Sequence, residues 1–336
     1  MLTQFLAILR NAFVESVRQP IMVVLILAVA LLLVLSTAGA ANTLDDDTLM
    51  FIQIGLSTLL LAGLFMAGFT ATGVLTLEIE NKTVLTVVSK PVPRPLVILG
   101  KYVGAAGAMT LAIWPMVMIL LLCLRHGVMQ TASHEFDGPV LVFGTAAFTV
   151  ALFGSLLVNY LYRWPFVSTF VYSLAALMSG AVLLVMVVSK HWELQPIHSE
   201  FVAEKSLFAP VLMGVLLLYE ALLIYCAMAI LFSTRLGQVM TILFTLVGGV
   251  LMSQIGAWRA AVSGPADGIL ERGFQLLINL IYHITPDLNF LWVADDLSSG
   301  LTVSSTYVLS VSLYSLLFIV ALLSLAVALF QTREVG

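Results

Sequence analysis

The sequence predicts an all-α fold: a polytopic integral membrane bundle of six to eight transmembrane helices. Of its 336 residues, 61% are hydrophobic and only 10% are charged, whereas a typical soluble domain carries about 25% charged residues. The apolar residues form runs long enough to cross a bilayer, which takes roughly 20 residues per helix. Alternation of polar and apolar residues with a period of two is absent, which disfavours a β-barrel.

The first element is a predicted amphipathic helix over residues 2–18, within an N-terminal unit at 1–20. One helical stripe is apolar and the other face carries Arg10, Glu15 and Arg18. A short helix of this kind beside a span lies in the membrane interface, and Pro20 then lets the chain turn into the first span. The competing interpretation is one long tilted helix over 2–41.

Eight runs with few or no charges follow, within a transmembrane unit at 21–336. They cover residues 21–41, 49–77, 98–124, 139–160, 166–188, 207–232, 239–257 and 304–330. The run at 239–257 is short and rich in glycine, which leaves the count open by one or two. We interpret 21–41 as a retained span rather than a signal peptide, because the region before it is too long and too amphipathic.

The distribution of basic residues predicts that both termini face the cytoplasm. With eight spans and a cytoplasmic N-terminus, nine of the 14 basic residues lie inside and five lie in the longer outside loops. Basic residues near span ends set membrane orientation. We therefore expect a multi-pass protein of the cell membrane, which in a bacterium is the inner membrane.

Two spans carry small residues at helical spacing. Gly63 and Ala67 lie four residues apart, as do Gly100 and Gly104. Such faces let helix backbones approach closely in lipid. They predict tight packing, within the chain or against a second copy.

The largest outside segment covers residues 258–303 and contains a second amphipathic stretch. Leu270, Phe274, Leu277 and Ile281 share one face of it. This pattern predicts an interfacial helix on the outer leaflet, and a ninth partial span is the competing interpretation.

The search for chemistry-bearing residues yields one candidate, Glu220, in the middle of a predicted span. A carboxylate at that depth is costly unless it is paired, protonated or beside a wet cavity. It is either a translocation site or a structural hydrogen-bonding group, with Tyr219 or Tyr225 as its partner. No catalytic or metal-binding motif is present, so we expect no enzymatic activity and no metal. His134, Glu135 and Asp137 have the right side chains for a metal but are expected to be solvated loop residues.

Residues 78–101, EIENKTVLTVVSKPVPRPLVILGK, place charges and prolines between two apolar spans. The final Gly100-Lys101 is not a phosphate loop, because Pro95 stands where such a loop needs glycine and Tyr102 replaces Ser or Thr. The ordered set resembles the permease subunits of type-2 ATP-binding-cassette (ABC) exporters. In that family the second span is followed by an acidic residue, a Lys-Thr or Gly-Thr pair, a short apolar helix, Pro-Val-x-Arg and Gly-Lys. The resemblance covers about residues 1–125 and is only general beyond them.

The resemblance implies a coupling segment at 78–97 that docks onto a separate cytoplasmic ATPase subunit. The residues expected to carry this coupling are Glu78, Glu80, Lys82, Thr83, Leu85, Val88, Pro91 and Arg94. It also implies that ATP and magnesium bind only to the ATPase, and that a second permease copy pairs with the chain. Family members usually have six spans with re-entrant outer helices, so eight spans means either an extra pair or re-entrant segments counted as spans.

The function expected from these observations is that of the permease subunit of an ATP-driven exporter in contact with membrane lipid, and not with nucleic acid. Two functions of other classes stay open. One is a secondary transporter that uses Glu220 as its proton site, and the other is a membrane scaffold that transports nothing.

Overall fold

The structure is a computed structural model that describes residues 1–38, 47–76, 93–129, 136–196, 207–264, 268–299, 301 and 303–332. Eight of its helices are long and apolar enough to cross a membrane. They are α2 (Pro20–Ala38), α3 (Asp47–Ala71) with its π-helical continuation η1 (Thr72–Thr76), α6 (Arg94–His126), α7 (Gly138–Tyr162), α8 (Phe166–Val187), α10 (Phe208–Ser233), α11 (Gln238–Val262) and α14 (Ser305–Gln331). They correspond one to one to the predicted runs, which confirms an all-α polytopic membrane bundle.

Within the described residues, four shorter helices accompany the long ones. They are α1 (Leu2–Val17), α12 (Ile269–Ile284), the 3-10 turn η2 (Leu288–Leu291) and α13 (Ala294–Ser298). Both predicted amphipathic stretches are therefore helical. The chain leaves helical conformation at Arg18 and Gln19, so the alternative of one continuous helix through the first span is wrong.

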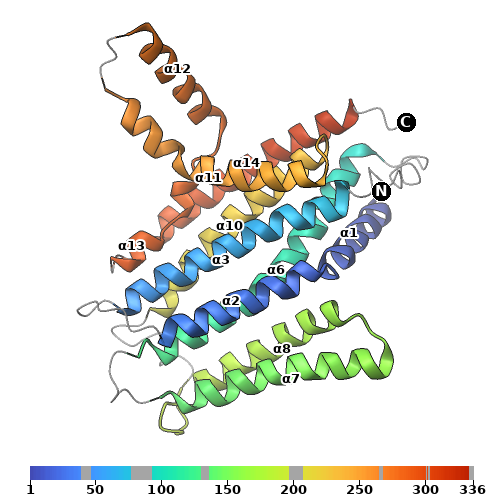
Figure 1. Cartoon of the computed structure of the whole chain (residues 1–336), viewed down its shortest axis with the longest axis vertical. Coiled ribbons are helices and arrows are strands. Elements are labelled where there is room, and N and C mark those ends of the chain that lie inside the picture. Colours follow the sequence, from blue (N-terminus) through green and yellow to red (C-terminus); the bar gives the residue numbers. More distant parts are fainter. Residues whose placement is uncertain are drawn as a thin grey trace.

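The long helix α6 is the central element of the bundle (Figure 1). In its most apolar stretch 78% of the residues are buried, against 17% in α7. It packs against α1, α2, α3, α8 and α10, whereas α7 packs mainly against α8. Figure 1 shows α7 and α8 as a hairpin along one edge of the bundle.

Glycines allow α1 to lie directly on α6. A Cβ atom added at Gly104 would lie 2.6 Å from the carbonyl oxygen of Leu9 and 2.7 Å from the Cβ of Ala12. At Gly100 it would lie 2.9 Å from the side chain of Ile8. The predicted small-residue face of this span is therefore occupied by a helix of the same chain.

The other predicted small-residue face lies on α3. A Cβ atom at Gly63 would lie 2.3 Å from the side chain of Leu222 in α10, and Ala67 is fully buried. This face too packs within the chain.

The α11–α12 hairpin projects from the rest of the bundle (Figure 1). Two bonds from the Nε2 of Gln275, each 2.8 Å, to the carbonyl oxygens of Val262 and Gly264 join the two helices. The guanidinium of Arg259 lies 4.1 Å from the centre of the Tyr282 ring. Leu270 is 91% exposed and Phe274 is 53% exposed, so the apolar face of α12 is not covered by the chain itself.

Both termini lie at one end of the bundle (Figure 1), which we call the terminal end. The α7–α8 and α10–α11 turns lie there too, and α13 lies at the opposite, distal end. This arrangement is what an even number of spans produces.

Candidate functional site

Two arginines at the terminal end hold the last turn of α14. The Nη1 of Arg94, the first residue of α6, donates to the carbonyl oxygens of Phe330, at 3.3 Å, and Gln331. The Nη2 of Arg235, in the α10–α11 turn, donates to the carbonyl oxygen of Leu329 at 2.9 Å and to the hydroxyl of Thr332. The last carbonyls of a helix lack partners within the helix and carry partial negative charge. We call this group the arginine clamp.

A buried lysine of α6, seven residues after Arg94, joins this helix to η1. Lys101 is only 4% exposed, and its Nζ donates to the carbonyl oxygen of Val74. π-helical turns are rare and often occur at functional sites. The ammonium of Lys101 is directed into the protein and not towards lipid head groups.

In the sequence, the predicted coupling segment at 78–97 follows η1 and runs into the start of α6. Its residues Glu78, Glu80, Lys82, Thr83, Leu85, Val88 and Pro91 lie outside the described part of the chain. Arg94 is described and belongs to the arginine clamp. Arg235 did not stand out in the sequence, where its only signal is a single basic residue in a short turn between two spans.

A second polar group lies within the bundle, around Glu220 of α10. Its Oε1 accepts a hydrogen bond from the hydroxyl of Ser312 at 2.6 Å, and its Oε2 accepts one from Ser315 at 3.0 Å. The two serines lie three residues apart on α14 and therefore share a face. Two hydroxyl donors lower the cost of placing a carboxylate at this depth.

The tyrosines expected beside Glu220 are not the partners that the structure gives it. The hydroxyl of Tyr219 lies 2.6 Å from that of Thr110 in α6. The serines were missed because serines recur throughout α14, and a sequence does not show which of them faces α10. The geometry makes Glu220 an interhelical link. Within the described ranges, no three His, Cys, Asp or Glu side chains gather in a way that could hold a metal ion.

We expect Glu220→Gln to lower the free energy of unfolding by about 1 kcal/mol, because an amide accepts through one oxygen only and a net hydrogen bond is worth about that much. Unfolding in detergent, followed by circular dichroism, measures the change. Ser310→Ala is the matched control, since the hydroxyl of Ser310 bonds only within its own helix. If the Glu220→Gln and Ser312→Ala effects simply add in a double-mutant cycle, the link contributes nothing.

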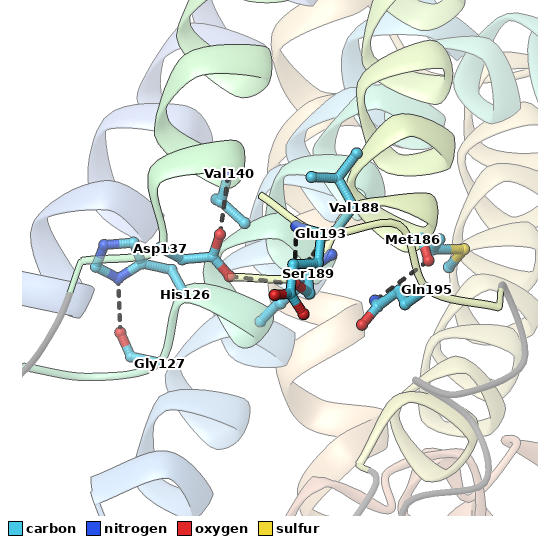
Figure 2. Close-up of polar contacts among 10 residues, drawn as sticks. His126, Gly127, Asp137, Val140, Met186, Val188, Ser189, Glu193 and Gln195 are labelled. Carbon is cyan, nitrogen blue, oxygen red and sulfur yellow. Dashed lines mark hydrogen bonds and ion pairs between the residues drawn. The ribbon is translucent and has the colours of Figure 1, made fainter. Parts of the chain in front are cut away.

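An ion pair at the distal end joins three helices (Figure 2). The Nε of Arg125, near the end of α6, lies 3.2 Å from the Oδ2 of Asp137, and their side chains are 4% and 0% exposed. The Nη2 of Arg125 donates to the carbonyl oxygen of Val188, beyond the end of α8, at 2.6 Å. The Oδ1 of Asp137 accepts from the amide of Val140 at 3.1 Å and so caps the start of α7. We call this group the distal ion pair.

The expectation that Asp137 is solvated is wrong, because its carboxylate is fully buried in the distal ion pair. The possible companions His134 and Glu135 lie outside the described residues. Beside the pair, α8 is followed by a tight turn in which the amide of Ser189 donates to the carbonyl oxygen of Glu193 at 2.8 Å (Figure 2). The side chain of Gln195 donates back to the carbonyl oxygen of Met186 in α8 at 3.2 Å.

Fold and sites together define a polytopic α-helical membrane protein with two polar groups near the bundle ends and one inside it. No family model and no curated protein matches the chain.

Proposed function

We propose that the chain is the transmembrane subunit of an ATP-driven export system of the ABC type-2 class, driven by a separate cytoplasmic ATPase. The ordered residues of 78–101, which resemble the coupling region of that class, support the proposal. The arginine clamp is the observation that carries it furthest. Arg94 lies within the segment expected to bind the ATPase, and it also contacts the end of α14.

A displacement of the coupling segment could reach the bundle by two routes, both of which pass through Arg94. One route is covalent, since Arg94 begins α6, the central helix. The other runs through the bonds of Arg94 to α14, which packs against α10. Lys101 adds a link back to η1. Helices packed at native density shift together rather than deform separately. A displacement of the coupling segment would therefore move several spans at once.

In this proposal the terminal end faces the cytoplasm, as the bias of basic residues favours. ATP and magnesium belong to the ATPase, and this chain carries no catalytic group. A second permease copy completes the transporter in the cell membrane.

Replacing residues 78–90 by a Gly-Ser linker is expected to abolish co-purification with the ATPase while leaving the protein inserted in the membrane. The segment supplies an apolar helix face and a charged rim, and helix-in-groove recognition needs both. Pull-down of the ATPase expressed with the tagged permease measures the effect. Normal recovery of the ATPase by the linker variant would refute the coupling role.

An arginine variant separates ATPase binding, measured by the same pull-down, from transmission, measured as transport per ATP hydrolysed. Arg94→Gln keeps the segment and removes the charge at the end of α14, so the ATPase should still bind while transport per ATP hydrolysed falls. Arg163→Gln is the matched control, because Arg163 is an exposed arginine in the α7–α8 turn of the same end. If Arg94→Gln and Arg163→Gln reduce transport per ATP hydrolysed equally, the arginine clamp has no part in transmission.

The alternative from another class is a secondary transporter that uses Glu220 as its proton site. Proton-coupled carriers place their sites at discontinuous helices, whereas α10 and α14 run unbroken past Glu220 and its serines. The geometry favours the interhelical link. Loss of transport in Glu220→Gln, with ATPase binding intact, would favour the alternative.

A further inference from the structure

An apolar cavity lies between α2, α6 and α7, at the distal half of the bundle. Its volume is about 640 Å³, within the range of roughly 300–1,000 Å³ typical of ligand pockets. Its walls are almost wholly apolar and include Leu27 and Val34 of α2, Ile119 and Leu122 of α6, and Leu141 and Phe148 of α7. Val34 and Leu141 are exposed, so the cavity opens towards the side of the bundle.

The depth of the cavity matches one leaflet of a bilayer. His126, at its outer end, is the last residue of α6, and Ala38 is the last of α2. Leu27 lies eleven residues deeper than Ala38 on α2, which at 1.5 Å per residue is about 16 Å. Half of a hydrocarbon core about 30 Å thick is of that length.

One polar side chain in this wall has an unused hydrogen-bonding atom. His126 is 6% exposed, and its Nδ1 lies 3.0 Å from the carbonyl oxygen of Gly127. Since a carbonyl only accepts, Nδ1 is the donor, and Nε2 of the neutral ring is an acceptor. Within the described part of the chain this buried Nε2 has no hydrogen-bond partner. Figure 2 shows the ring turned away from the Ser189–Glu193 turn.

Among the described residues, the walls of the cavity supply no donor for this nitrogen. The hydroxyls of Thr37 and Thr145, which also line the cavity, donate to carbonyl oxygens of their own helices. Buried acceptors in folded proteins are almost always paired, so a donor that arrives with an apolar ligand would complete the hydrogen bonding of His126.

We propose that this cavity binds one acyl chain of a lipid from the distal leaflet, and that an N–H or O–H of its head group donates to the Nε2 of His126. The lateral opening admits the chain from the bilayer, the apolar walls cover it, and the histidine stands at head-group level. The site selects lipids with a hydrogen-bond donor. It is independent of the proposed ATPase partner, so either proposal can fail without the other.

Two lipids with identical acyl chains test the proposal. Phosphatidylethanolamine carries an ammonium donor, whereas phosphatidylcholine has none. Native mass spectrometry of the purified full chain with equal amounts of both should show phosphatidylethanolamine retained in preference by about two- to tenfold, the range that one net hydrogen bond provides.

Variants assign that preference to the cavity. His126→Phe should remove it, His126→Gln should keep it because the amide oxygen accepts, and Gly144→Leu should reduce retention of both lipids by filling the cavity. His191→Phe, an exposed histidine elsewhere, should behave like the unaltered chain. The proposal is overturned if the unaltered chain retains the two lipids equally or retains neither, or if His126→Phe keeps the preference.

Discussion

Replacing Arg125 by alanine is expected to lower the free energy of unfolding by about 3–5 kcal/mol, the usual cost of removing one partner of a buried ion pair. The variant leaves the carboxylate of Asp137 buried beside the start of α7, and it also removes the bond to the carbonyl oxygen of Val188. α6, α7 and α8 would thus lose their common link. Unfolding of the purified protein by denaturant in detergent micelles measures the loss.

Two further variants separate the charge of Asp137 from its capping role. Asp137→Asn retains an oxygen that can accept from the amide of Val140 but removes the charge, so it should cost less than Asp137→Ala. The Arg125→Ala, Asp137→Ala double variant should cost less than the sum of the two single variants. If Arg125→Ala lowers the free energy of unfolding by less than about 1 kcal/mol, the pair is no stronger than an exposed salt bridge and the prediction is wrong.

Gly104→Ala is expected to destabilise the protein by about 1–3 kcal/mol, the typical cost of overpacking. The added Cβ would lie 2.6 Å from the carbonyl oxygen of Leu9 and 2.9 Å from the amide nitrogen of Phe13. These are backbone atoms of α1, so α1 itself would have to move away from α6. The midpoint of thermal unfolding in detergent reports the change.

Gly154→Ala and Gly180→Ala are the matched controls. Both glycines are helical, and a Cβ atom at either would have no atom within 4 Å apart from its chain neighbours and the backbone of its own helix. Alanine is the better helix former by up to about 1 kcal/mol, so these variants should be neutral or more stable. Destabilisation at all three positions would mean that backbone effects, and not contact with α1, explain Gly104.

The eight spans could be predicted because each is a long apolar run, but their places in the bundle could not. α6 and α7 have almost the same mean hydropathy, 2.2 and 2.1, although α6 is central and α7 lies at an edge. Lipid and protein interior are both apolar, so hydropathy does not distinguish a helix that faces one from a helix that faces the other. The glycines at 100 and 104 gave the better signal, since they indicated close packing on that face of α6.

The polar sites could be predicted only in part, because each combines one conspicuous residue with inconspicuous ones. Glu220 stands out in an apolar span, whereas Ser312 does not stand out in α14. Arg94 lies within a motif, whereas its partners are backbone carbonyls that no sequence pattern marks. Asp137 and His126 adjoin a predicted loop, and composition there indicates solvation rather than the burial that the helix ends create.

The arginine clamp also has a consequence for biosynthesis. Domains and segments made first begin to fold first, and Arg94 and Arg235 both precede α14 in the chain. The two guanidinium groups are thus already present when the carbonyls of residues 329–331 leave the ribosome. Insertion of α14 then links the start of α6 to the α10–α11 turn. Contacts between helices made early in synthesis are thus completed only when the last span is inserted.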